Sequence, residues 1–105
     1  MTKPLVPRQM FLHEFEPLVG QTFVAACDPR PAELKLMQAV PVRMTGAILR
    51  PQFTLIFSSS PSVLLVAGTY ALHCGQFGPE LVDLAPINPP PEETGGRHYY
   101  QAAFS

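Results

Sequence analysis

Proline is the residue that most constrains the fold of this chain. The sequence contains 13 prolines among 105 residues, against a usual share of roughly 5 %. A proline lacks the backbone N–H and fixes φ, so it ends or bends a helix and is kept out of the interior of a sheet. Prolines at this density exclude long helices and favour short strands joined by stiff loops.

The length of the chain suits one small domain. Hydrophobic residues make up 47 % of the sequence, enough for a core, while charged residues make up only 14 %, against about 25 % in a typical domain. Residues 1–9 contain Pro4 and Pro7 and show no periodicity, so they are predicted to form an extended arm. Residues 10–105 are predicted to form a single domain.

One short amphipathic helix is predicted over residues 10–18. Phe11, Phe15 and Leu18 have the spacing that places them on one helix face. Pro17 and Gly20 are expected to limit and end the helix. Because so short a helix is not stable alone, its aromatic face is expected to pack against a sheet.

Alternating apolar and polar residues predict strands along the rest of the chain. The clearest strand is Gln52–Ser58, in which Phe53, Leu55 and Phe57 share one face. The other predicted strands are residues 22–27, 33–40, 69–74, 81–87 and 99–104. The pattern leaves undecided whether a further short strand lies near residues 42–44. This pattern predicts a mainly β fold, a small antiparallel meander barrel or sandwich of about six strands with one short N-terminal helix. Its interior is expected to hold Phe23, Phe53, Phe57, Tyr70, Tyr100 and Phe104.

The order of these core and turn residues resembles a known protein family. The matching segments are Phe15-x-x-Leu18-x-Gly20-x-x-Phe23, Leu34-x-Leu36, Pro51-x-Phe53-x-Leu55-x-Phe57, Gly68-x-Tyr70-x-Leu72, Pro86 and Tyr100-x-Ala102-x-Phe104. The family consists of small uncharacterised bacterial β proteins of a single domain, and the resemblance covers residues 10–105. It implies the same fold, no assigned activity, and an association with gene neighbourhoods of phage-tail-like proteins.

The sequence lacks a spaced set of residues that would carry catalysis or hold a metal. His13 and Glu16 share a helix face but lack the further ligands that a metal site needs. Cys74 follows His73, and neighbours in a strand point to opposite faces. Gly95-Gly96-Arg97 differs from the known phosphate-binding loops. The chain is therefore predicted not to be an enzyme and to use no metal or cofactor.

The net charge and the lack of long apolar segments limit the kinds of partner that the sequence predicts. A net charge of -1 gives no broad positive field, so nucleic acid is not an expected partner. The sequence shows neither the apolar region of a secretory signal nor an apolar run long enough to span a membrane. A cytoplasmic protein without membrane contact is therefore expected, with Cys27 and Cys74 reduced. Whether these two thiols approach each other cannot be judged from the sequence.

Self-association is the function that the sequence favours. By strand parity Ile56, Leu81 and Tyr99 lie on outer faces, and with Arg50 they form the candidate interaction surface. The competing interpretation packs the three apolar residues under the helix and the Pro41–Pro51 segment. The leading hypothesis is a structural or protein-interaction module that forms homo-oligomers, within the phage-tail-like assembly that the resemblance implies. The alternative is a barrel that binds a small apolar ligand. An enzyme would have to assemble its site from distant residues, such as the three histidines with Cys27 and Asp28.

Overall fold

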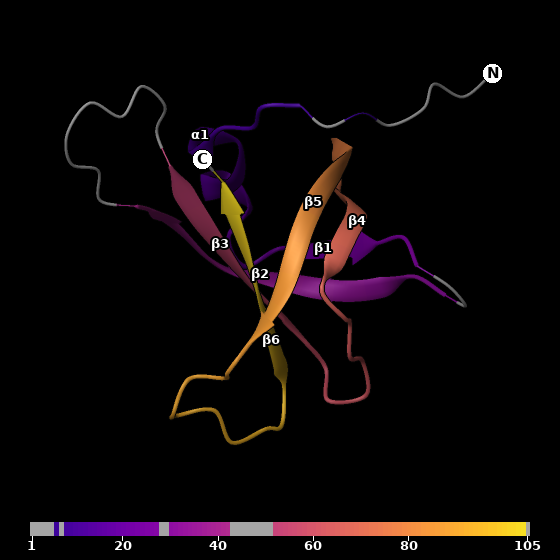
Figure 1. Ribbon diagram of the computed structural model, residues 1–105, viewed down its shortest axis with the longest axis vertical. Coiled ribbons are helices and arrows are strands. Elements are labelled where there is room, and N and C mark those ends of the chain that lie inside the picture. The colour runs from indigo at the N-terminus through magenta and orange to yellow at the C-terminus, as the bar shows by residue number, and fades with distance from the viewer. Residues whose placement is uncertain (1–5, 7, 28–29, 43–51, 105) are drawn as a thin grey trace.

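The chain forms a mainly β fold with one short helix. The computed structural model describes residues 6, 8–27, 30–42 and 52–104. The helix α1 (Leu12–Phe15) continues into a single 3-10 turn, η1 (Glu16–Leu18). The strands are β1 (Thr22–Ala25), β2 (Ala32–Pro41), β3 (Phe53–Ser59), β4 (Gly68–Cys74), β5 (Phe77–Ile87) and β6 (His98–Phe104) (Figure 1). The predicted fold class is thereby confirmed.

The sheet closes on itself into a barrel. Neighbouring strands are antiparallel and follow the order β1-β2-β3-β6-β5-β4, with β1 paired to β4. This order differs from the simple meander that was predicted, because β3 pairs with β6 and not with β4. In this order β3 and β4 lie on opposite sides of the barrel, so the residues that join them have to cross one of its ends.

Aromatic side chains pack the interior and close the end of the barrel next to α1. Phe15 on α1 is fully buried. The ring centroid of Phe15 lies 5.8 Å from that of Phe53 and 5.8 Å from that of Phe104, and the Phe53 and Phe104 rings stack at 4.5 Å. Four of the predicted core aromatics are buried, namely Phe23, Phe53, Phe57 and Tyr100, whereas Tyr70 and Phe104 are only partly buried. The expectation that the helix packs on the barrel through an aromatic residue is correct.

A polar network closes the opposite end. The Ser59 hydroxyl donates to the Val63 carbonyl at 2.9 Å and lies 3.0 Å from the Tyr100 hydroxyl. The Leu65 amide donates to the Tyr100 hydroxyl at 3.1 Å. Because buried polar groups are costly unless they are hydrogen-bonded, these contacts fix the crossing connection over the barrel end. They also explain why β3 extends one residue beyond the predicted strand and buries Ser59.

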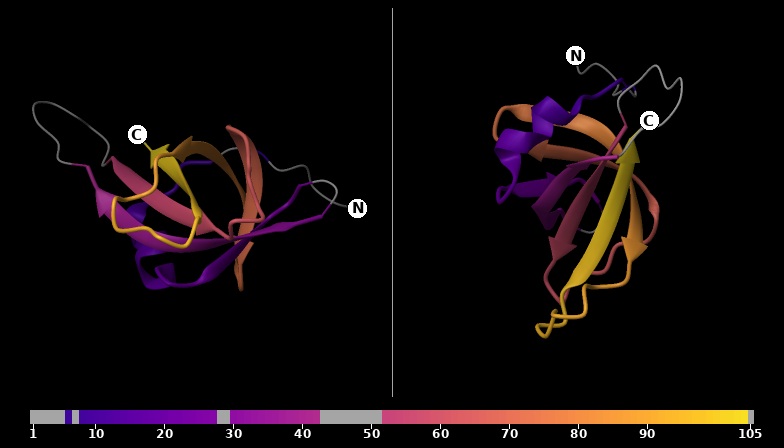
Figure 2. Two further views of the ribbon diagram at one scale, coloured as in Figure 1. Left: turned by 90° about the horizontal axis from the view of Figure 1, so that it is seen from below. Right: turned by 90° about the vertical axis from the view of Figure 1, so that its left-hand side faces the viewer.

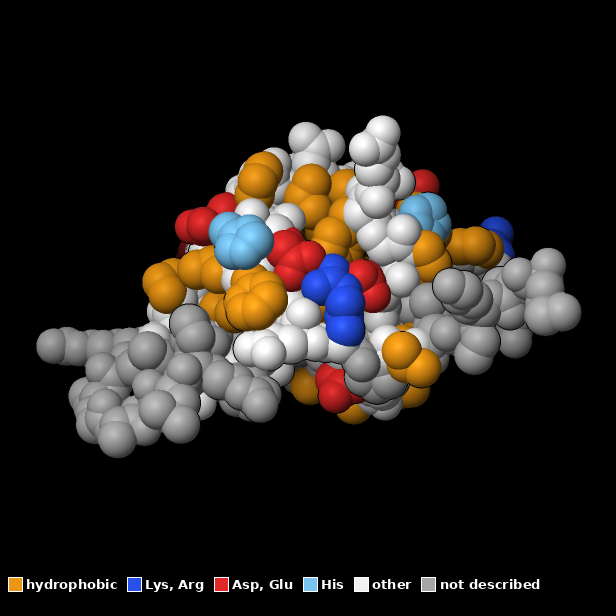
Figure 3. Space-filling model, turned by 90° about the horizontal axis from the view of Figure 1, so that it is seen from above, with side chains coloured by type: hydrophobic (Ala, Val, Ile, Leu, Met, Phe, Trp, Pro, Cys, Tyr) orange, Lys and Arg blue, Asp and Glu red, His pale blue; other side chains and the backbone are white. Residues whose placement is uncertain are grey.

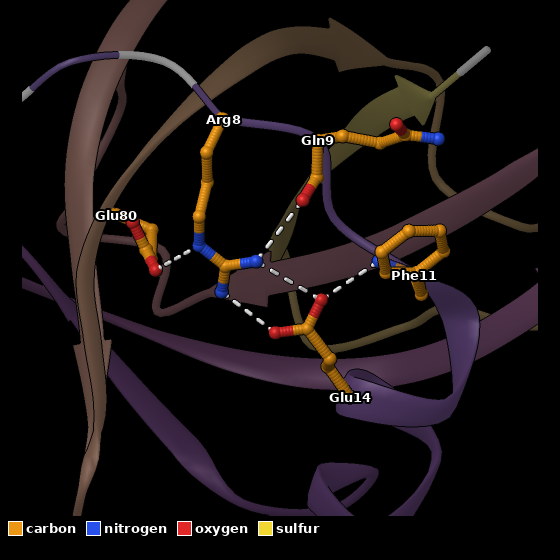
Figure 4. A network of polar contacts seen from close by, with 5 residues as sticks. All are labelled: Arg8, Gln9, Phe11, Glu14 and Glu80. Carbon is orange, nitrogen blue, oxygen red and sulfur yellow. Dashed lines mark hydrogen bonds and ion pairs between the residues drawn. The ribbon is translucent and has the colours of Figure 1, made fainter.

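Salt bridges of Arg8 hold the segment before the helix against the barrel. Arg8 donates to both carboxylate oxygens of Glu14, at 2.6 and 3.2 Å, and to Glu80 on β5 (Figure 4). Figure 3 looks onto this end of the molecule, where a cationic side chain lies between acidic ones. The Arg8 guanidinium and the Phe11 amide hold the pKa of Glu14 below its ordinary value. Arg8 therefore links the helix to the strand from the N-terminal side.

Several predicted boundaries differ from the observed ones. The α1 helix begins at Leu12, so Phe11 lies before it, is 41 % exposed, and stacks on His13 instead of joining the core. Strand β5 begins at Phe77, four residues earlier than predicted, because the tight turn after Cys74 needs only two residues. Of the undecided short strand near residues 42–44, Val42 lies outside β2, and residues 43 and 44 fall outside the described residues.

Candidate interaction surface

The outward face of β2, β3 and β6, which we call the β2–β3–β6 wall, carries the candidate surface. One row of outward side chains crosses it. Lys35 pairs with Ser58, Ser58 with Tyr99, and Tyr99 with Ile87 on the end of β5. A second row places Gln38 beside Ile56, and Ile56 beside Gln101. Both rows belong to one continuous face because paired residues in neighbouring strands point to the same side.

A bulge in β2 shapes this wall. The register with β3 shifts between Leu36 and Gln38, which leaves Met37 without a partner residue. Ala39 then pairs with the buried Leu55, while Gln38 pairs with Ile56 on the outer side. A bulge adds one residue to a strand and changes the face of every residue after it. Met37 and Gln38 are thereby both available to the outer wall.

An open groove of about 440 Å³ lies on this wall, and we call it the tyrosine groove. Its lining is largely apolar, with two glutamates from the loop after β5. The lining residues are Met37, Gln38, Ile56, Ile87, Asn88, Pro90, Glu92, Glu93 and Tyr99. The groove therefore combines an apolar floor with an acidic rim.

The loop between β5 and β6 covers Tyr99 and fixes one side of the groove. This loop projects from the barrel end opposite the helix (Figure 2). The Tyr99 hydroxyl donates to the Glu93 carboxylate at 2.6 Å, and the Gly95 amide donates to the same carboxylate at 2.8 Å. The bond from Tyr99 lowers the pKa of Glu93, and the same bond raises the pKa of Tyr99. Glu93 is thus held as an ionised acceptor over the edge of Tyr99.

A second hollow, of about 670 Å³, adjoins the other end of the row, and we call it the basic hollow. Among the described residues, its lining contains three cations, Arg30, Lys35 and Arg97, and one acidic residue, Glu33. The Arg97 guanidinium donates to the hydroxyl of the buried Ser58 through Nε at 3.3 Å and Nη2 at 3.1 Å. Among the described residues, the ion pairs involve Arg8 alone, so these three cations remain available to other groups.

The structure brings together two of the four candidate interaction residues. Ile56 and Tyr99 both line the tyrosine groove. Tyr99 lies on the outer side as parity predicted, but it is only 7 % exposed because the β5–β6 loop packs over it. Leu81 lies elsewhere, on β5 opposite Ala71 of β4. Arg50 falls outside the described residues.

Sequence reasoning missed the charged members of this surface. The candidate interaction surface predicted from the sequence does not include Lys35, Glu92 or Glu93. Their relation to Ile56 and Tyr99 depends on strand register and on a loop that folds back, so no local pattern encodes it. Opposite charges flanking an apolar wall residue are a signal only once the strand order is known.

The remaining candidate groups lie apart from this surface or serve local structure. The Cys27 and Cys74 thiols are free, and Cys27 donates to the Arg30 carbonyl at 3.3 Å. In the part of the chain that the structure describes, no three His, Cys, Asp or Glu side chains gather closely enough to hold a metal ion. None of the helices formed by the described residues is long and apolar enough to cross a bilayer.

Comparison with known families places the chain in one of them. A family model described as a domain of unknown function, DUF6916, matches residues 10–104. The chain belongs to the DUF6916 family. No curated protein and no solved structure matches it. The DUF6916 match includes every strand of the barrel and agrees with the uncharacterised family expected from the sequence.

Proposed function

We propose that this DUF6916 domain is a non-enzymatic protein-interaction module that associates with copies of itself through the β2–β3–β6 wall. The observation that carries the proposal is the tyrosine groove, whose apolar side chains Met37, Ile56 and Ile87 lie on the outside of the barrel. Apolar groups gathered in an open groove with a polar rim are typical of surfaces that bind another protein.

The packing of the interior argues against the alternative of a barrel that binds a small apolar ligand. Such a ligand needs a preformed apolar space inside the barrel or at its mouth. Phe15 occupies one mouth and contacts Phe53, Phe77 and Phe104. The crossing connection and its bonds to Tyr100 occupy the other. The tyrosine groove lies on the outer wall, and the basic hollow lies beside the crossing connection, with the cations Arg30, Lys35 and Arg97 in its lining.

The charges of the wall support a second copy of the chain as the partner. The tyrosine groove brings Glu92 and Glu93 to one end of the wall, and the basic hollow brings Arg30 and Lys35 to the other, with Arg97 between them on Ser58. One molecule therefore carries both halves of a complementary contact. Complementary charges raise association rates and select the partner more than they add affinity.

The broader setting is also part of the proposal. A rigid, self-associating barrel would serve as a building block of a larger assembly, and the resemblance to bacterial proteins near phage-tail-like genes supports such a setting. We assign no enzyme chemistry, because among the described residues no thiol forms a hydrogen bond with a basic side chain. Cys27, for example, is directed at the carbonyls of Ala25 and Arg30.

Site-specific photo-cross-linking in cells tests the proposal. A photoreactive phenylalanine analogue replaces Gln38 or Gln101 on the wall, and Gln76 in the β4–β5 turn as a matched control; all three are exposed glutamines. The experiment is carried out in the cytoplasm of a bacterial host, the compartment expected from the sequence. The proposal expects a discrete product of two chains, joined by identified peptides, at the wall positions but not at Gln76. Equal or absent cross-linking at all three positions would contradict it.

A further inference from the structure

We infer that two copies pair about a two-fold axis, with Lys35 of each copy facing Glu92 of the other, so that the assembly closes as a dimer. This inference rests on the proposed self-association and adds its symmetry and the residues that determine its specificity. A two-fold interface uses the same surface twice, so each patch must find its complement on that same surface.

The outward row of side chains supplies the required arrangement. Lys35 lies at one end of the row, and Ile87 at the other end leads directly into the loop that carries Glu92. Lys35 on β2 and Ile87 on β5 are separated by three strand pairings around the barrel, at opposite ends of the row. A two-fold axis between Ser58 and Tyr99 exchanges these ends. It therefore sets the cation of one copy opposite the carboxylate of the other, twice.

The closed form follows because both patches share one face. A head-to-tail contact forms rings or filaments when the two complementary patches face in different directions. Here the tyrosine groove and the basic hollow are neighbours on adjoining strands, and Lys35 and Tyr99 both flank Ser58. Occupying one patch brings the second copy over the other patch as well, which leaves no free end for a third copy.

The groups near the axis are compatible with this pairing. Arg97 lies beside the axis on Ser58, so each copy brings a cation there. Arg97 also contributes to the lowered pKa of the nearby Glu93 carboxyl. In each copy the negative charge of Glu93 therefore accompanies the positive charge of Arg97. The side chains of Lys35 and Glu92 are exposed and, among the described residues, form neither ion pairs nor hydrogen bonds, which makes them suitable for substitution.

Charge-reversed variants test the inference, with self-association measured by sedimentation equilibrium. The unmodified chain is expected to reach the mass of two chains of 11.5 kDa and to stop there, over a range of about 1 µM to 1 mM. Lys35→Glu and Glu92→Lys each place like charges at both contacts of a dimer. Each is expected to weaken association by about tenfold or more. Glu16→Lys and Gln76→Glu, at exposed positions away from the wall, are controls that should leave association unchanged.

Two rescues separate charge pairing from damage to the fold. An equimolar mixture of Lys35→Glu with Glu92→Lys should form a mixed dimer, because each contact again joins opposite charges. The chain that carries both substitutions should dimerise with itself for the same reason. Absence of both rescues would overturn the inference.

The failure of the inference and that of the proposed function are distinguishable. An unmodified chain that grows beyond two copies would overturn the two-fold arrangement alone and leave self-association in place. An unmodified chain that stays monomeric at every concentration would overturn both.

Discussion

The two sides of the barrel treat their polar groups differently. On the outward face of β4 and β5, the Thr69 hydroxyl donates to the Asp83 carboxylate, its register partner, and Leu81 lies opposite Ala71. On the β2–β3–β6 wall, Lys35 lines the basic hollow and Glu92 lines the tyrosine groove, and within the described part of the chain neither forms an ion pair. Both faces contain polar groups that bind each other, but Lys35 and Glu92 on the second face have no ion-pair partner among the described residues.

This difference shows that apolar character alone does not identify a binding face. Leu81 and Ile56 are both outward-facing and half-buried, and strand parity gave them equal weight. What distinguishes them is their surroundings. Ile56 lines an open groove together with Glu92 and Glu93, and Leu81 lies opposite an alanine in a face whose hydroxyl and carboxylate bind each other.

The largest expected effect comes from placing a charge on each face. Ile56→Asp is expected to weaken self-association by about 30-fold or more, because it sets a carboxylate in the apolar floor that the partner covers. Leu81→Asp, the matched change on the other face, is expected to alter association by less than about twofold. Sedimentation equilibrium measures both, with circular dichroism to show that each variant is folded. Equal effects of the two changes would remove the distinction between the faces.

A pair of hydroxyl deletions has an intermediate effect on stability. Tyr99→Phe removes a hydroxyl that donates to Glu93, and Thr69→Val removes one that donates to Asp83. Tyr99 is almost fully buried while Thr69 is exposed. The loss of unfolding free energy is therefore expected to be roughly two to three times larger for Tyr99→Phe. Urea unfolding of both variants checks this, and a larger loss for Thr69→Val would contradict it.

Lowering the pH should reduce the stability that the Tyr99 hydroxyl contributes to the fold. The Tyr99 hydroxyl lowers the pKa of Glu93 in the folded chain below the ordinary value of 4.5. A carboxyl whose pKa is lowered by folding stabilises the fold above its unfolded pKa, and that contribution is lost as the pH falls through the folded pKa. The difference in melting temperature between the unmodified chain and Tyr99→Phe should therefore shrink as the pH falls below 4.5. A difference that stays constant from neutral pH into acid would show that Glu93 is not the acceptor that matters.

The smallest effect is expected from neutralising one carboxylate on each face. Glu92→Gln is expected to weaken self-association by about threefold, since each dimer loses two exposed ion pairs of modest strength. Asp83→Asn should leave association unchanged, because its partner Thr69 belongs to the same molecule. Added salt should reduce the effect of Glu92→Gln, since exposed pairs are screened. A salt-independent effect would contradict the ionic contact.

Local pattern was sufficient for the strands whose alternation is unbroken. Phe53, Leu55 and Phe57 face the core as predicted, and Tyr100 and Ala102 do the same on β6. The alternation has a period of two, so it determines which side of a strand is buried without reference to its neighbours. Phe15 likewise followed from helical spacing. These residues account for the correct prediction of a small β barrel with an aromatic interior.

Features that depend on distant residues could not be predicted in the same way. The bulge at Met37 reverses the faces that alternation from Leu36 would give to later residues. The pairing of β3 with β6 is stabilised in part by bonds between Ser59 and Tyr100, 41 residues apart. The burial of Tyr99 depends on Glu93, in a loop that gave no periodic signal. These features together create the candidate surface.

Hydrogen–deuterium exchange of the unmodified chain at low and high concentration tests the central claim most directly. The account predicts that raising the concentration slows amide exchange in β2, β3, β6 and the β5–β6 loop, while exchange in β4 stays unchanged. Slower exchange confined to β4 and the β4–β5 turn, or no dependence on concentration in any strand, would contradict it.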